Sequence, residues 1–96
     1  MAHLYKMSEW QSASGLWYCN DTEDLGSGSG RWWIPARILG IPPVMFVDLL
    51  MKDFKVDNIS YNKEKDVLVY SWKSQAAMRK FKNWINKQAR EANFVI

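Results

Sequence analysis

The last quarter of the chain constrains the fold more than any other segment, because its pattern is that of one long amphipathic helix. No glycine or proline interrupts residues 74–93, and Ser74 is a favourable residue for a helix N-cap. Apolar and small side chains recur there at spacings of three and four, which places them on one helical face. This predicted buried face consists of Ala77, Phe81, Trp84, Ile85, Gln88 and Ala92, with Met78 and Ala89 at its edge.

The opposite face of this helix is basic. It carries Arg79, Lys82, Asn83, Asn86, Lys87 and Arg90, and Lys80 lies near the border. Residues 73–96 contain six basic residues against Glu91 alone, a net charge of +5, whereas residues 1–30 have a net charge of −3. Solvated helices usually mix charge signs to gain i,i+4 pairs. A one-sided cationic face therefore favours a phosphate-bearing partner, and a merely solubilising surface is the alternative.

The remaining segments predict a small antiparallel sheet and a second helix. Runs rich in β-branched and aromatic residues are typical of strands and occur at residues 16–19, 31–34, 58–62 and 67–72. Paired prolines open a helix over about residues 43–54, and residues 35–41 could add a short helical turn ended by Gly40. Residues 1–10 are expected to be a flexible leader. Residues 20–30, acidic and then rich in Gly and Ser, are expected to be a flexible loop.

These elements predict one α+β domain spanning residues 1–96. Its order would be β-β-α-β-β-α, with an antiparallel sheet of about four short strands covered by two helices. In the helix at 43–54, a stripe of Val44, Val47, Leu50, Met51 and Phe54 is predicted to be buried. The predicted core of the domain comprises Trp17, Val47, Leu50, Phe54, Leu68, Tyr70, Phe81, Trp84 and Ile85.

Residues 36–49 carry a pattern that resembles a helix-turn-helix motif. In that motif a small residue lets two helices approach and a glycine makes the turn, as Ala36 and Gly40 would here, and apolar residues such as Phe46 and Leu49 set the angle. The resemblance implies that the hairpin at 58–72, with Lys63 and Lys65 at its tip, is similar to the wing of a winged-helix protein. The alternative is a proline-initiated core helix after a tight turn.

The chain lacks the residues that most catalytic and metal sites need. Its single histidine, His3, and its single cysteine, Cys19, provide no Ser–His or Cys–His pair and no thiolate metal cage. The glycine run at 26–30 is followed by Arg31 and an aromatic run, without the lysine, hydroxyl and helix of a phosphate-binding loop. We therefore expect no enzymatic activity, no cofactor and no metal.

The expected function is binding, most of all nucleic-acid binding through the basic helix. Trp32 and Trp33 would point in opposite directions in a strand, so one of them could be exposed and could stack on bases or anchor a protein. The predicted contact residues are Lys73, Arg79, Lys80, Lys82, Lys87, Arg90, Trp32 and Trp33.

The alternative function is that of a small protein-binding adaptor or inhibitor, of the kind that phages and mobile elements encode, with an exposed Trp-rich surface. A homodimer through the same surface is a third possibility. No apolar run reaches the length of a membrane span. The lone cysteine fits a reducing compartment, so a cytoplasmic location without membrane association is expected.

Overall fold

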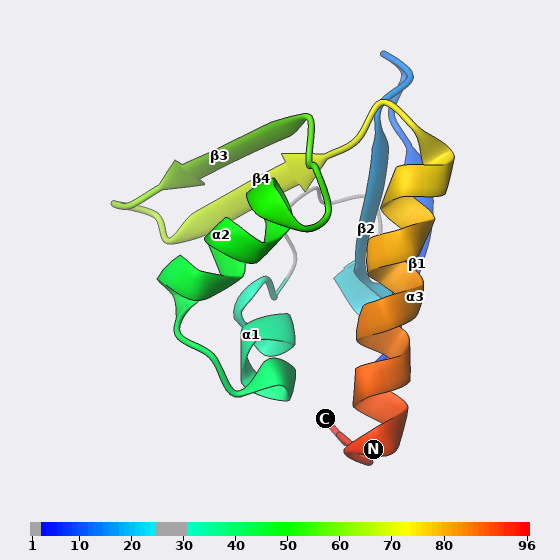
Figure 1. Ribbon diagram of the computed structural model, residues 1–96, viewed down its shortest axis with the longest axis vertical. Helices are drawn as coiled ribbons and strands as arrows, with labels where there is room; N and C mark the ends of the chain where they lie inside the picture. The colour runs from blue at the N-terminus through cyan, green and yellow to red at the C-terminus, as the bar shows by residue number, and fades with distance from the viewer. Residues whose placement is uncertain (1–2, 25–30) are drawn as a thin grey trace.

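Each pair of strands is followed along the chain by helical segments in the computed structural model, which describes residues 3–24 and 31–96. Their order is β1 (Met7–Gln11), β2 (Trp17–Asp21), the 3-10 turn η1 (Thr22–Asp24), α1 (Trp33–Leu39), α2 (Pro43–Lys52), β3 (Asn58–Asn62), β4 (Val67–Ser71) and α3 (Gln75–Glu91). Figure 1 shows two antiparallel hairpins and three helices in one small compact unit. The α+β class is confirmed, and the predicted order is roughly matched.

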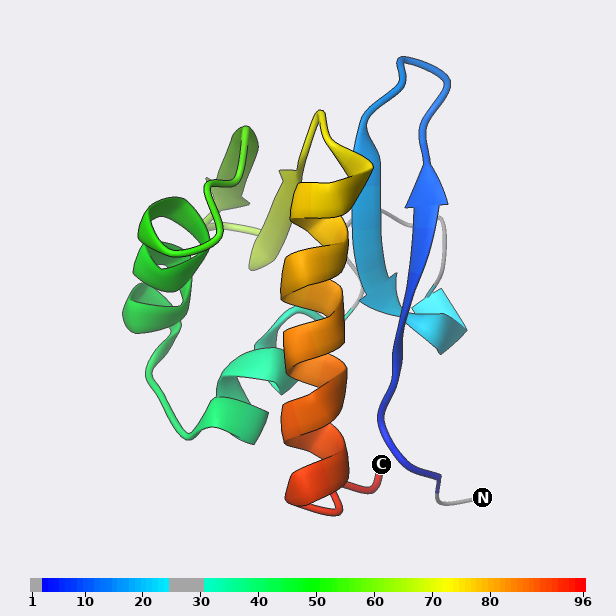
Figure 2. The same ribbon diagram turned by 45° about the vertical axis from the view of Figure 1, so that its right-hand side comes forward.

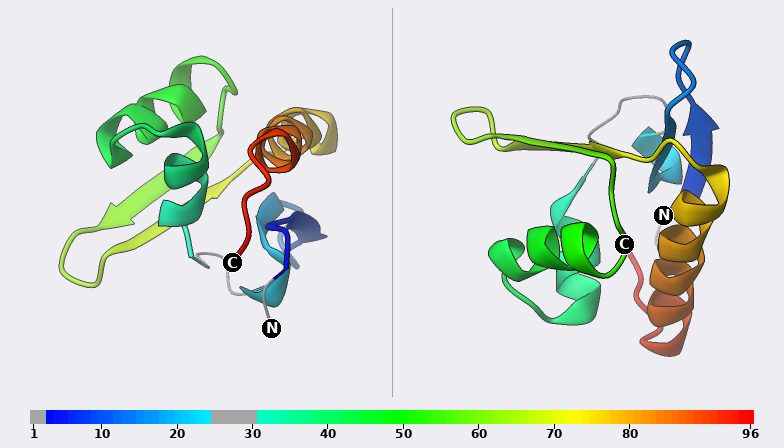
Figure 3. Two further views of the ribbon diagram at one scale, coloured as in Figure 1. Left: turned by 90° about the horizontal axis from the view of Figure 1, so that it is seen from below. Right: turned by 45° about the horizontal axis from the view of Figure 1, so that its top comes forward.

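The strands form two separate two-stranded sheets instead of the single four-stranded sheet that we expected. β1 pairs with β2 and β3 with β4, both antiparallel. Among residues 3–24 and 31–96, the backbones of the two sheets are joined by one isolated bridge, in which Trp17 and Trp72 exchange hydrogen bonds of 2.7 and 2.9 Å. Figures 1 and 3 show the hairpins running in different directions away from this point, so the ladder does not continue.

The predicted C-terminal helix is confirmed as α3, which lies between the two hairpins (Figure 2). The Ser74 hydroxyl accepts a hydrogen bond of 3.2 Å from the Ala77 amide, as an N-cap should. The helix buries Met78, Phe81, Ile85 and Ala89 against the core. Asn86, which we placed on its solvated face, is also buried, because β1 packs against that side of the helix.

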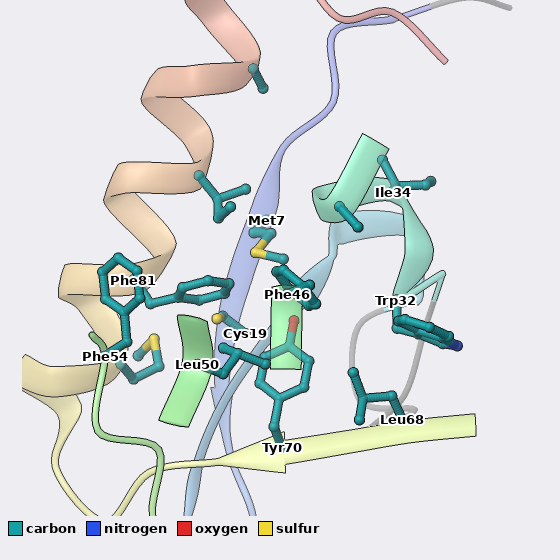
Figure 4. Packing of buried hydrophobic residues seen from close by; sticks show 14 of the residues in the cluster. Met7, Cys19, Trp32, Ile34, Phe46, Leu50, Phe54, Leu68, Tyr70 and Phe81 are labelled. Atoms are coloured by element: carbon teal, nitrogen blue, oxygen red, sulfur yellow. The ribbon is translucent and has the colours of Figure 1, made fainter. Parts of the chain in front are cut away.

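The core is built around the ring of Phe81 on α3. Four aromatic rings from three other parts of the chain lie with their centroids 5.1 to 6.0 Å from it: Phe46, Phe54, Tyr70 and Trp72. Figure 4 shows several of these rings converging between α3 and the β4 strand. Such tilted and edge-on packing stabilises aromatic pairs beyond their buried area.

The predicted core is largely confirmed. Leu50, Phe54, Leu68, Tyr70, Phe81 and Ile85 are buried, whereas Trp17, Val47 and Trp84 are partly buried and pack against the core. The stripe predicted for α2 is wrong in part. Phe46 and Leu50 face the core, and Val44 and Met51 face solvent. Because α2 is apolar around much of its circumference, its periodicity does not select one face.

The N-terminal segment is not a flexible leader where the structure describes it. Residues 7–11 form β1, and the amides of His3 and Tyr5 donate to the carbonyls of Ile96 and Phe94 at 3.0 and 2.9 Å. Tyr5 and Met7 are buried in the core. The C-terminal tail and α3 supply hydrogen-bond partners and apolar contacts to this segment. Because these partners lie far away in the sequence, local patterns could not reveal that the segment is ordered.

Residues 31–34 are not a strand. Trp33 begins α1, which continues through the predicted helical turn and ends at Gly40, a residue with a left-handed φ of 67°. Pro35 falls in the first turn of the helix, where a missing amide hydrogen is tolerated. Within the predicted loop at 20–30, residues 20–21 end β2 and residues 22–24 form η1; residues 25–30 lie outside the described part of the chain.

Candidate functional site

Two of the predicted contact residues on α3 are engaged by a carboxylate of the protein itself. Glu9 on β1 accepts hydrogen bonds from Arg79 Nε at 3.0 Å and Nη2 at 2.8 Å, and from Lys82 Nζ at 2.8 Å. Gln75 Nε2 adds a fourth contact at 3.1 Å. These donors, Arg79 first and Lys82 next, lower the pKa of Glu9 from 4.5 to about 2. The cluster clamps β1 onto α3 and reduces the positive charge offered to a partner.

Replacing Glu9 tests this clamp. Because the folded protein holds the Glu9 pKa below its unfolded value, the clamp stabilises fully above pH 4.5 and is lost as the pH falls toward 2. Glu9→Gln should lower the free energy of unfolding at pH 7 by about 1–2 kcal/mol, and the gap to wild type should close near pH 2. Urea unfolding of both proteins between pH 2 and pH 7 measures this difference in the free energy of unfolding. Glu64→Gln, in the exposed β3–β4 turn, is the control and should leave the free energy of unfolding at pH 7 nearly unchanged.

Four of the predicted cations are exposed and lie outside the Glu9 cluster: Lys73, Lys80, Lys87 and Arg90. Within residues 3–24 and 31–96, the closest carboxylate to any of these four is Glu91, at 3.9 Å from Lys87 Nζ. Lys80 and Lys87 are seven residues apart on α3, which places them on one helical face about 10 Å apart, and Lys73 precedes the N-cap Ser74. The remaining basic surface is therefore a sparse row rather than a dense patch.

The two adjacent tryptophans have different environments. Trp32 is buried, donates its indole N–H to the Asp66 carbonyl at 3.0 Å, and meets Tyr61 edge-on at 5.7 Å between ring centroids. Trp33 is 40 % exposed at the start of α1. Trp32 therefore holds the β3–β4 turn in place and is not available as a contact residue, whereas Trp33 is.

The outer face of α2 exposes three large apolar side chains, of which two, Val44 and Met51, belong to the stripe predicted to be buried. Val44 is 69 % exposed, and Met45 and Met51 are each 52 % exposed. Asp48 and Lys52 lie on the same face. Three exposed large apolar side chains, together with two charged residues, make this helix face a candidate interaction surface.

A hollow of about 460 Å³ lies where α1, α2 and α3 meet. Apolar side chains from the three helices and the α1–α2 turn form its wall, and charged side chains on α2 and just after its end form its border. The lining residues are Leu39, Ile41, Met45, Leu49 and Trp84, with Asp48, Lys52 and Asp53. An apolar floor with a charged rim is the usual organisation of a protein interface.

A second, smaller hollow of about 390 Å³ lies on the other side of α2. It is lined by Trp32, Pro43, Val44, Val47 and Tyr61. The Tyr61 hydroxyl at its border donates to the Asp66 carboxylate at 2.7 Å, which raises the pKa of Tyr61. The exposed face of α2 is therefore a ridge between two apolar hollows.

The helix-turn-helix resemblance extends to shape but not to surface chemistry. α1 and α2 cross at 92° around the turn at Gly40, close to the angle of that motif. The exposed residues of α2, however, include Val44, Met45 and Met51, and its exposed charged residues are Asp48 and Lys52. Base readout relies on side chains such as Arg, Asn or Gln. α1 and α2 therefore share the bend of that motif, but the exposed face of α2 is suited to apolar contact.

The single cysteine, Cys19, is free and buried. Burial raises the pKa of the Cys19 thiol, so it stays protonated. Residues 3–24 and 31–96 contain no group of three His, Cys, Asp or Glu side chains placed to hold a metal. Across the same residues no single helix could cross a bilayer, and α1 and α2 approach the required length only as a pair bent by 92°.

Comparison with known proteins identifies no relative. The chain matches no protein-family model, no curated protein and no solved structure. Its function must therefore be inferred from the arrangement of its own residues, in which the α2 ridge and the hollow beside Trp84 are the most pronounced exposed features.

Proposed function

We propose that this protein is a non-enzymatic, protein-binding domain, an adaptor or inhibitor, that receives an apolar side chain of its partner in the hollow between α1, α2 and α3. The observation that carries the proposal is the exposure of Met45, an unbranched and adaptable side chain at the mouth of an apolar hollow. Trp84 in the same wall is of the residue type most enriched in binding hot spots.

The composition of the site supports a protein partner over a small molecule. The hollow is open, and its border carries two carboxylates and an ammonium group, Asp48, Asp53 and Lys52. Lys80 and Lys87 flank Trp84 by helical spacing, four residues before and three after it. Such a border can pair with charges that surround an apolar anchor on another protein.

The chemistry of the remaining chain is compatible with a binding role in the cytoplasm. The strongly lowered pKa of Glu9 arises from an ion-pair cluster that joins β1 to α3, and the raised pKa of Cys19 arises from burial. The Glu9 carboxylate is held by ion pairs and the Cys19 thiol is buried, and neither residue lines one of the two hollows beside α2. A buried free thiol, Cys19, also suits a reducing compartment.

Nucleic-acid binding through α3 is the second candidate. Lys80, Lys87 and Arg90 on α3, with Lys73 just before the helix, are exposed and could contact a few phosphates. It ranks second because Arg79 and Lys82 are held by Glu9 and Trp32 is buried. Trp33 would supply the one stacking ring of the originally predicted pair.

A charge placed at the mouth of the hollow should abolish partner binding. Tagged protein would be exposed to a nuclease-treated lysate of the source cells, and retained proteins identified by mass spectrometry. The retained partner would then be purified and titrated calorimetrically. Met45→Asp should weaken its binding at least about 30-fold, or roughly 2 kcal/mol. Met51→Asp is the matched control, because Met51 lies on the same helix with the same exposed fraction but does not line this hollow.

Two results would contradict this proposal. In the first, Met45→Asp and Met51→Asp weaken binding equally. In the second, no protein is retained, and a fluorescein-labelled 25-nucleotide DNA or RNA binds wild type with a steep salt dependence that Lys80→Ala with Lys87→Ala flattens by about two in log–log slope. The second result would establish the nucleic-acid candidate instead.

A further inference from the structure

The β3 strand is the open edge of its sheet. β3 pairs with β4 on one side, and in the described part of the chain no backbone hydrogen bond joins Asn58–Asn62 to any other strand or loop. Figure 1 shows β3 at the border of the molecule, with β4 on its inner side. Natural proteins usually protect such an edge with charges or proline, and β3 carries neither within its five residues.

The sequence of this edge is self-complementary. Read in either direction about Ser60, the strand Asn-Ile-Ser-Tyr-Asn alternates amide, apolar, hydroxyl, apolar and amide side chains. In an antiparallel pair of two copies centred on Ser60, Ile59 of one copy lies opposite Tyr61 of the other. An aromatic ring opposite a β-branched side chain is a favourable cross-strand pair. Asn58 lies opposite Asn62, and no like charges meet within the strand.

The charges that flank the strand agree with the same register. Asp57 precedes the strand and Lys63 follows it, and both are exposed. Pairing about Ser60 places Asp57 of each copy opposite Lys63 of the other, which gives two symmetric ion pairs, one at each end. A two-fold interface requires this reciprocal arrangement, because every contact between a residue of one copy and a residue of the other occurs a second time with the copies exchanged.

We propose that the protein forms a two-fold homodimer in which the β3 edges of two copies pair antiparallel about Ser60, giving a continuous four-stranded sheet. Ile59 and Tyr61 share a face with Tyr70 and Leu68, their partners on β4, and those two residues face the core. The dimer therefore covers Tyr61, which is 49 % exposed in a single copy. It leaves the hollow beside Trp84 open, so this inference does not depend on the proposed function.

The oligomeric state tests the proposal. Because each strand contributes only five residues, the interface is small, and we expect dimerisation at concentrations on the order of 10–100 µM. Sedimentation equilibrium of wild type over about 5 µM to 1 mM should show it. Lys63→Asp places Asp opposite Asp at both ends and should weaken dimerisation about tenfold or more. Asp57→Lys should do the same, and an equimolar mixture of the two variants should restore a heterodimer of near wild-type affinity.

One control variant and one replacement variant complete this test. Lys80→Asp changes the net charge equally but lies on α3, and it should leave dimerisation unchanged. The Asp57 carboxylate also accepts a hydrogen bond of 2.8 Å from the Lys73 amide. If Asp57→Lys is misfolded by circular dichroism, Asp57→Asn replaces it, because Asn keeps an acceptor and removes the charge; it should weaken dimerisation a few-fold.

Three outcomes would overturn the inference: a wild-type monomer at every concentration, a dimer insensitive to Lys63→Asp, or variants that are not rescued by mixing. A dimer that is lost in Met45→Asp but kept in Lys63→Asp would also overturn it, because the contact would then use the α2 hollow. Partner binding that is unchanged in Lys63→Asp would leave the proposed function standing on its own.

Discussion

Trp72→Ala should remove most of the stability of the protein. Trp72 is fully buried and packs against Phe81 and Tyr70, and its indole N–H donates to the Phe54 carbonyl at 2.8 Å. Truncating a buried tryptophan costs about 3–5 kcal/mol through lost burial and the cavity left behind. A buried carbonyl without its donor adds about 1–3 kcal/mol. A domain of this size has only about 5–10 kcal/mol in total, so we expect a largely unfolded variant at 37 °C.

Urea unfolding followed by far-UV circular dichroism measures this loss. Trp72→Phe keeps most of the ring packing and removes the indole donor, and it should cost less than Trp72→Ala. Trp33→Ala removes a tryptophan that is 40 % exposed and should cost no more than about 1 kcal/mol. Equal midpoints for Trp72→Ala and Trp33→Ala would show that Trp72 does not hold the two hairpins and α3 together.

Asn86→Ala should detach the N-terminal hairpin from α3. The Asn86 side chain accepts from the Met7 amide at 2.8 Å and donates to the Met7 carbonyl at 3.1 Å, and the pair is buried. Removing the carboxamide leaves two buried backbone groups of β1 without partners, which costs about 2–4 kcal/mol. In native-state hydrogen exchange, the Met7 amide should lose protection more than the amides of β3 and β4.

Asn83→Ala is the control for this substitution. Asn83 is exposed one turn earlier on α3, so its replacement makes the same gain in helix propensity without touching β1. The difference between the two variants therefore isolates the contribution of the Asn86 hydrogen bonds. A difference below about 1 kcal/mol would mean that water replaces the carboxamide at Met7.

The success of prediction varied with the contrast between polar and apolar residues in each element. Along α3 the large apolar and basic side chains separate cleanly, so its limits, its cap at Ser74 and its core residues Phe81 and Ile85 follow from local spacing. β1 has no such contrast. Met7, Glu9 and Gln11 share one face, and Glu9 is placed there by Arg79 and Lys82, which are seventy or more residues away.

The candidate site was recognised only in part for the same reason. The cations of α3 were predicted, but whether a given cation is available to a partner depends on where the carboxylate of β1 lies. The α2 ridge was missed because Val44 and Met51 have the same apolar character as the buried Phe46 and Leu50. No local pattern distinguishes an apolar residue that packs inside from one that is presented to another molecule.

The amino-acid sequence by itself determined the α+β class, the hairpin at 58–71 and the amphipathic C-terminal helix, because hydrophobic periodicity and capping act over a few residues. Only the tertiary structure decided that the N-terminal segment is a strand, that Asn86 is buried and Arg79 neutralised, and that α2 turns an apolar face outward. These features depend on contacts between segments that are distant in the sequence. Such contacts form only when all the helices and strands pack together around one small core.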